Sequence, residues 1–323
     1  MSLSGEWYNS TLGDNFSSTD FIPWDLSIQW PAPIILFVFI TGLTFLLGVP
    51  GNGAVVWVTG FKMKRGVHTV CFLNLAVVDL TYCLTLPLLV ASYFVTTPWS
   101  QAKLFGMFRS CTININMSAS SFLLTLISIC RCLAVTRPIW FRQKLRLSWV
   151  CAACFVAWVL AFFTCLPHLL SEQIVPYRRH KTWAALLVIW AIVTFGLPFA
   201  IMATCYIVIA RELRGVQSAK CRKPVRLMVT VVAAFVVCWL PNIVCGLLQD
   251  YFDLVTWDWV DVTFGLASFN SALNPLLYVF SGREFRQVFR RSLAASLHLA
   301  FAEECSELGR VPPDSTVSTV TRV

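Results

Sequence analysis

The sequence predicts an all-α membrane protein, a bundle of seven transmembrane helices followed by a short amphipathic eighth helix. Three observations predict it: the composition, the length of the apolar segments and the placing of the basic residues between them. Of the 323 residues, 57% are hydrophobic and 13% are charged, and the mean hydropathy is +0.71. Soluble domains carry about 25% charged residues, so we expect lipid to solvate much of this surface.

Seven apolar segments are long enough to cross a bilayer, which takes about 20 helical residues each. Lipid favours helices because every backbone polar group must be satisfied within its own segment, and the alternation of a membrane β-barrel is absent. The expected spans are 31–60, 69–94, 105–136, 148–170, 183–210, 226–248 and 256–280. Prolines inside most of them predict kinks. These are Pro50, Pro87, Pro167, Pro198, Pro241 and Pro275.

Basic residues gather in every second connection between the spans. They are Lys62, Lys64, Arg65, Arg137, Arg142, Lys144, Arg146, Arg211, Arg214, Lys220, Arg222, Lys223, Arg226, Arg283, Arg286, Arg290 and Arg291. By the positive-inside rule these connections are cytoplasmic and the N-terminal tail, 1–30, is extracellular. The net charge of +9 is then a consequence of topology and not a sign of nucleic-acid binding.

Three glycosylation sequons test this orientation. Those at Asn9 and Asn15 fall in the tail that we expect to be extracellular, where both asparagines can be modified. The third, at Asn116, lies inside a span and is expected to stay unmodified. Residues 1–30 do not resemble a cleavable signal peptide, so the first span is expected to act as an uncleaved signal anchor.

Polar residues inside the spans are candidate functional residues, because a polar or charged group in lipid is costly. Asn52, Asp79 and Asn274 lie in the first, second and seventh spans. If they meet in the bundle centre, they form a hydrated pocket in which Asp79 can hold a cation or a proton. The alternative is that they only make hydrogen bonds between helices, worth about 0.6 kcal/mol each.

Several motifs, each in its expected span, resemble the rhodopsin-like (class A) G-protein-coupled receptors. They are Gly51-Asn52, Leu75–Asp79, Trp158, Pro198 with Tyr206, Cys238–Pro241 and Asn274–Tyr278. The resemblance implies a multi-pass receptor of the plasma membrane, not an enzyme, that engages heterotrimeric G protein and arrestin. It also implies residue roles. Asn52, Asp79, Asn270 and Asn274 would form a sodium-linked polar network, Trp239 a switch under the ligand pocket, and Tyr206 and Tyr278 would move in around Arg131 as the sixth helix opens.

Within that family the chain is similar to the chemoattractant receptors for formyl peptides, complement anaphylatoxins and chemerin. The stretches that carry this similarity are Trp57–Met63, Phe72–Ala76, Arg137–Trp140 and Phe280–Phe285. It implies an extracellular peptide or lipid mediator as ligand and a G protein of the inhibitory class. The run Pro138–Phe141 is also similar to Mas-related receptors, so a receptor for basic peptides or amphiphiles is an alternative.

One departure from the family lies at the third-helix arginine. Cys130 stands before Arg131 where the family has an acid, so Arg131 lacks the charge-assisted hydrogen bond that would hold it inward. We expect raised basal activity or altered coupling. An atypical or decoy receptor, which engages arrestin without G-protein turnover, is the alternative.

Two further departures lie near the expected ligand pocket. The family's outer disulfide is missing, because its third-helix position falls on Gly106 and residues 168–182 contain no cysteine, while Cys111 has no evident partner. Trp190 stands where the peptide-binding relatives carry an arginine before the fifth-helix proline, and an aromatic ring cannot make a bidentate carboxylate contact.

Other residues are therefore the candidates for binding ligand, together with Trp190 and Trp239. Arg109, or Arg178 and Arg179 in the second outer loop, can replace the missing arginine. The basic loop can equally snorkel at the membrane interface. Asn114, Ser118 and Ser121 share one helix face, where they either line the pocket or join helices.

The chain after the seventh span has two predicted parts. Residues 282–299 have an apolar and a basic side, as in a helix that lies in the lipid interface. The cytoplasmic tail, 300–323, is rich in serine and threonine, whose phosphates can recruit arrestin. Its last residues, Thr321, Arg322 and Val323, match a ligand of PDZ proteins.

Overall fold

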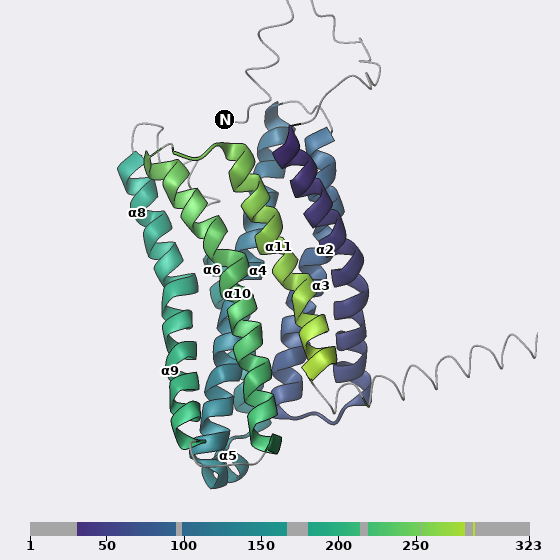
Figure 1. Cartoon of the computed structure of the whole chain (residues 1–323), viewed down its shortest axis with the longest axis vertical. Helices are drawn as coiled ribbons and strands as arrows, with labels where there is room; N and C mark the ends of the chain where they lie inside the picture. The colour runs from purple at the N-terminus through teal and green to yellow at the C-terminus, as the bar shows by residue number, and fades with distance from the viewer. Residues whose placement is uncertain are drawn as a thin grey trace, which may run out of the picture.

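The computed structural model describes residues 31–94, 99–166, 180–213, 219–252 and 254–281, together with Gln287. Several predictions lie outside these residues: the tail with Asn9 and Asn15, the loop arginines Arg178 and Arg179, the rest of helix 282–299, and the tail that ends in Thr321, Arg322 and Val323. Within the described residues the chain is a bundle of long helices (Figure 1).

Seven elements of membrane-spanning scale make up the described bundle, and they correspond to the seven expected spans. They are α2 (Ala32–Trp57) with η1 (Val58–Lys62), α3 (Val67–Phe94), α4 (Trp99–Thr136), α6 (Leu147–Phe163), α8 (His180–Ala191) with η2 (Ile192–Gly196) and α9 (Leu197–Glu212), α10 (Ala219–Phe252) and α11 (Trp257–Ser281). The short helix α5 (Pro138–Lys144) joins α4 to α6 at one end of the bundle (Figure 1). We call this end the Arg131 end, and the end where α2, α4 and α11 begin the Arg109 end.

Length and hydropathy alone identify fewer spans than the packing does. Five described helices are long and apolar enough to cross a membrane, or six if α5 and α6, which meet at 89°, count as one span. Helix α11 is not among them, because it carries a polar face. Its buried polar residues are Ser268, Asn270, Ser271 and Asn274.

Helix α6 shows why lipid must surround this bundle. It buries one narrow stripe at helical spacing, Val150, Cys154, Ala157 and Ala161. Its opposite face exposes large apolar side chains, among them Trp149 and Phe155, each 69% exposed. An apolar surface of this extent is not stable in water, and it fits the acyl chains of a bilayer.

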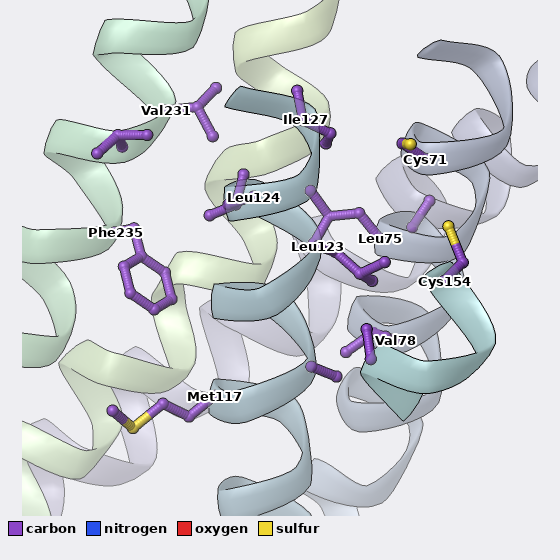
Figure 2. Close-up of a cluster of buried hydrophobic side chains, with 14 of the residues drawn as sticks. Cys71, Leu75, Val78, Met117, Leu123, Leu124, Ile127, Cys154, Val231 and Phe235 are labelled. Atoms are coloured by element: carbon purple, nitrogen blue, oxygen red, sulfur yellow. The ribbon is translucent and has the colours of Figure 1, made fainter. Parts of the chain in front are cut away.

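The apolar core is centred on α4. Figure 2 shows Leu123, Leu124 and Ile127 of α4 between Phe235 and Val231 of α10 on one side and Leu75 and Cys71 of α3 on the other. All of these side chains are at most 2% exposed. Helix α4 therefore lies between α3 and α10 in the apolar core.

The ends and irregularities of the helices differ in part from the predictions. Helix α6 ends at Phe163, earlier than the predicted residue 170, and the Thr164 hydroxyl donates to the Ala161 carbonyl just beyond that end. A π-helical turn, η2, precedes Pro198, where only a kink was expected. Apolarity measures how far lipid-compatible sequence extends and does not encode these local hydrogen-bond choices.

Candidate functional site

Asp79 lies fully buried on α3 in the middle of the bundle. The Asn116 amide of α4 donates to Asp79 Oδ1 at 3.3 Å, and the Asn274 amide of α11 donates to Oδ2 at 2.8 Å. Hydrogen bonds to a carboxylate are stronger than neutral ones. One carboxylate therefore joins three helices.

A second layer of hydrogen bonds extends this network to α2. The Ser271 hydroxyl donates to Asn116 Oδ1 at 3.3 Å, and the Asn52 amide donates to the Ser271 carbonyl at 2.8 Å. The structure thus brings the expected Asn52, Asp79 and Asn274 together. Sequence reasoning missed Asn116 and Ser271, although a polar residue in the centre of an apolar span was the signal that could have found Asn116.

Several polar atoms around the network have no hydrogen-bond partner within the described part of the chain. Both amide atoms of Asn270 are buried in this way, as are the Ser120 hydroxyl and Asn52 Oδ1. Ser120 and Asn270 each lie four residues from a network asparagine, on the same helix face. A buried polar atom without a partner is costly. Carboxylate, amide and hydroxyl oxygens together suit a hard cation, so these residues fit a sodium ion with water.

The Arg109 end holds an ion pair between α4 and α11. Arg109 Nη1 lies 2.9 Å from Asp261 Oδ1, and the side chains are 32% and 17% exposed. The guanidinium also stands 5.3 Å from the centre of the Phe264 ring, a cation–π distance. Arg109 was a predicted ligand residue, whereas its pairing with Asp261 was not foreseen.

The other candidates for the pocket wall lie in different environments. Asn114 is buried, at 5% exposed. The Ser118 and Thr164 hydroxyls are 3.0 Å apart. Ser118 therefore joins α4 to the end of α6, which was one of the two alternatives for it. Trp190 is half-buried and packs against the apolar core.

Trp239 stands at the end of a row of aromatic rings. Its ring lies 6.0 Å from Phe235 on the same helix, and Phe235 lies 5.9 Å from Phe195 in η2. Trp239 is 1% exposed, and its indole N–H has no hydrogen-bond partner among the described residues. The row links the π-helical turn before Pro198 to the proposed switch in α10.

The Arg131 end carries the residues expected to contact a G protein. The buried Cys130 thiol lies beside the Cys71 thiol of α3. The Tyr206 hydroxyl lies 3.0 Å from that of Ser128, one turn before Arg131. The backbone of Tyr278 belongs to α11, while its side chain lies outside the described part. A cleft of about 440 Å³ opens beside α5, lined by Thr136, Arg137, Pro138, Ile139, Trp140, Gln143 and Lys144.

Comparison with known proteins agrees with this architecture. Residues 51–278 match the family described as 7 transmembrane receptor (rhodopsin family), and the chain belongs to that family. It is therefore a multi-pass membrane receptor and not an enzyme.

Its similar relatives are chemoattractant receptors. The chain is 34% identical to N-formyl peptide receptor 2 of Macaca mulatta over 302 residues, which cover 84% of the chain and 87% of the relative. It is 34% identical to the C3a anaphylatoxin chemotactic receptor of Danio rerio over 294 residues, 86% and 81% of the two chains. It is also 34% identical to formyl peptide receptor-related sequence 4 of Mus musculus over 319 residues, 89% and 94%. The expected resemblance to this group is confirmed.

Proposed function

We propose that this receptor lies in the plasma membrane with its Arg109 end outside, binds a chemoattractant-type peptide or lipid mediator, and activates a heterotrimeric G protein of the inhibitory class. The relatives, which are named for formyl peptides and C3a, support the ligand class. One observation carries the mechanism: α4 and α11 are joined at two levels, and the central one also includes the direct hydrogen bond from Ser271 to Asn116. Arg109 and Asp261 join the two helices at the Arg109 end. Asn116 of α4 and Asn274 of α11 join them through Asp79 in the centre of the bundle.

The ion pair at the mouth is where a ligand can act. A ligand carboxylate competes with Asp261 for the guanidinium of Arg109, which prefers planar anions. When it displaces Asp261, α11 is released from α4 at the outer end. A ligand shifts such an equilibrium only by its different affinity for the two states. Arg178 and Arg179 would add positive charge to the rim, and Asn114, Trp190 and Trp239 would contact the ligand further in.

A sodium ion at Asp79 is proposed to stabilise the resting arrangement. The ion would be held by the Asp79 carboxylate with Ser120 and Asn270, whose polar side-chain atoms have no hydrogen-bond partner among the residues that the structure describes. Asn52, Asn116 and Asn274 position the carboxylate and each other. Loss of the ion would allow α4, α3 and α11 to repack.

The Arg131 end is proposed to contact G protein and arrestin. Arg131 would bind G protein when α10 moves outward, with Tyr206 and Tyr278 closing around it. The phosphorylated tail would recruit arrestin, and Thr321, Arg322 and Val323 would bind a PDZ protein. Glycans on Asn9 and Asn15 would mark the outer side.

A second candidate function rests on Cys130. Its buried thiol lies beside Cys71, so the helix neighbour of Arg131 offers a thiol in place of a carboxylate. A receptor of this kind can bind ligand and recruit arrestin without turning over G protein.

A cell-based assay tests the proposal with probes of defined chemistry. Short N-formyl peptides, fatty-acid mediators and their matched C-terminal or carboxyl amides are applied while G-protein dissociation and arrestin recruitment are recorded. The proposal expects acids to act more strongly than amides, and Arg109→Gln to remove the difference. Asp258→Asn, an acid in the first turn of α11 outside the ion pair, is the control. Equal responses to acids and amides would contradict the assigned role of Arg109.

A further inference from the structure

Two cysteines of different helices meet near the Arg109 end. Cys165 follows the last turn of α6, and its Sγ lies 3.5 Å from the backbone carbonyl oxygen of Cys111 in α4. The two side chains are also neighbours, since each thiol perturbs the other. Cys111 is half-buried and Cys165 is 3% exposed. The thiols therefore face one another across the contact between the two helices.

The backbone around this pair is held in register. One residue before Cys165, the Thr164 hydroxyl lies 3.0 Å from that of Ser118 on α4. The same hydroxyl donates to the Ala161 carbonyl. Two sequential side chains of the α6 end, those of Thr164 and Cys165, thus contact α4.

We propose that Cys111 and Cys165 form a disulfide that joins α4 to the end of α6. The inference rests on the proposed orientation, which places this end of the bundle in the oxidising compartment where disulfides form and persist. The sequence offers no cysteine at Gly106 or in residues 168–182. The family's outer disulfide would have fixed α4 at position 106. The Cys111–Cys165 bridge would fix the same helix from within the bundle, two residues from Arg109.

The bond forms by two thiol–disulfide exchanges with a protein disulfide of the secretory pathway. The more accessible Cys111 thiolate attacks the oxidant disulfide and gives a mixed disulfide, while one oxidant thiolate leaves. The Cys165 thiolate then attacks Cys111 Sγ, and the second oxidant thiolate leaves. Both cysteines lose their protons, and the two electrons pass to the oxidant, which is reduced to a dithiol.

A second group of thiols supplies an internal control. Cys71, Cys130 and Cys154 are buried together at the Arg131 end, with Cys71 beside both others. The proposed orientation places them on the reducing side, so they stay as thiols although they are also close together.

The test is differential alkylation of the intact receptor taken from the cell surface. The receptor is denatured in detergent with N-ethylmaleimide, then reduced and treated with iodoacetamide, and each cysteine is read by peptide mass spectrometry. We expect iodoacetamide on Cys111 and Cys165 and maleimide on Cys71, Cys130 and Cys154. Maleimide on Cys111 and Cys165 would overturn the proposal. The readout involves neither ligand nor G protein, so it is independent of signalling.

Serine variants test the structural consequence. Cys111→Ser, Cys165→Ser and the double variant should lower the unfolding temperature equally, because each removes the same bond. A reducing agent should lower the unfolding temperature of the wild type to that of the variants. It should leave the unfolding temperature of the double variant unchanged. Additive losses in the two single variants, or a wild type indifferent to reduction, would overturn the bridge.

Discussion

Breaking the ion pair between Arg109 and Asp261 should destabilise the ligand-free receptor through a coupling specific to these two residues. Arg109→Gln and Asp261→Asn each leave a part-buried charge without its partner. The double variant leaves none, so its loss of stability should be smaller than the sum of the two single losses. The difference is the coupling between the side chains.

The magnitude follows from the distance and the burial. Unit charges about 4 Å apart gain about 4 kcal/mol at an effective dielectric constant of about 20. Fully exposed ion pairs retain about 0.2–1 kcal/mol of this attraction, because solvent screens the charges and the side chains lose entropy when they are fixed in place. With the side chains 32% and 17% exposed and Nη1 2.9 Å from Oδ1, we expect a coupling of about 1–2 kcal/mol. In domains of 150–250 residues 1 kcal/mol shifts the unfolding temperature by about 2–4 °C, so the cycle should show about 2–8 °C.

The assay is thermal unfolding of the purified receptor in lipid nanodiscs, for the wild type, the single variants and the double variant. Combining Arg109→Gln with Asp258→Asn gives a control cycle, because Asp258 lies on the same helix as Asp261 and outside the ion pair, and we expect additive losses there. Raising the salt concentration should reduce the coupling, because part of the pair is exposed. Additive losses in the cycle of Arg109→Gln and Asp261→Asn would refute the reasoning that this ion pair joins α4 to α11 at the Arg109 end.

Three other variants test the packing and the polar network by thermal unfolding. Gly48→Ala should lower the stability by about 1–3 kcal/mol, because the added Cβ would overlap the Cys83 Sγ. Adding Cys83→Ala should recover most of the lost stability. A double variant as unstable as Gly48→Ala alone would contradict the packing. Sodium in place of potassium should stabilise the wild type by about 1.4 kcal/mol at ten times its Kd and leave Asp79→Asn unchanged; equal stabilisation of both would place the ion elsewhere. Phe235→Ala should cost about 3–5 kcal/mol, whereas Phe155→Ala, at a side chain 69% exposed to lipid, should cost little; similar losses would contradict the assigned core.

The sequence predicted the seven elements because the length of an apolar span is a local property. The cost of a polar residue in lipid marked Asn52, Asp79 and Asn274 as functional candidates, and the resemblance to class A receptors implied that they share one network. The sequence could not supply the other partners of these residues. The sequence marks Asn116 only as a sequon inside a span, which is expected to stay unmodified. Its hydrogen bond to Asp79 depends on the register of α4 against α3.

The ion pair shows the same limit more clearly. Arg109 and Asp261 are separated by 152 positions in the chain, and nothing local to either residue indicates the other. The π-helical turn η2 was also missed. A proline predicts a disturbed hydrogen-bond ladder, but which irregular turn forms depends on how Phe195 packs against Phe235. Residues were thus predictable where their own chemistry demanded a partner, and not where packing chose the partner.

Nucleotide exchange is the measurement that tests the receptor's central role most directly. The wild-type receptor and Cys130→Asp are reconstituted into vesicles with each class of heterotrimeric G protein, and GTP binding is followed with and without the peptide and fatty-acid probes. We expect the wild type to catalyse exchange, most strongly with the inhibitory class, and Cys130→Asp to lower its ligand-free rate by placing a carboxylate next to Arg131 on the helix. No exchange by the wild type with any class, together with exchange by Cys130→Asp, would contradict G-protein signalling and favour the atypical receptor.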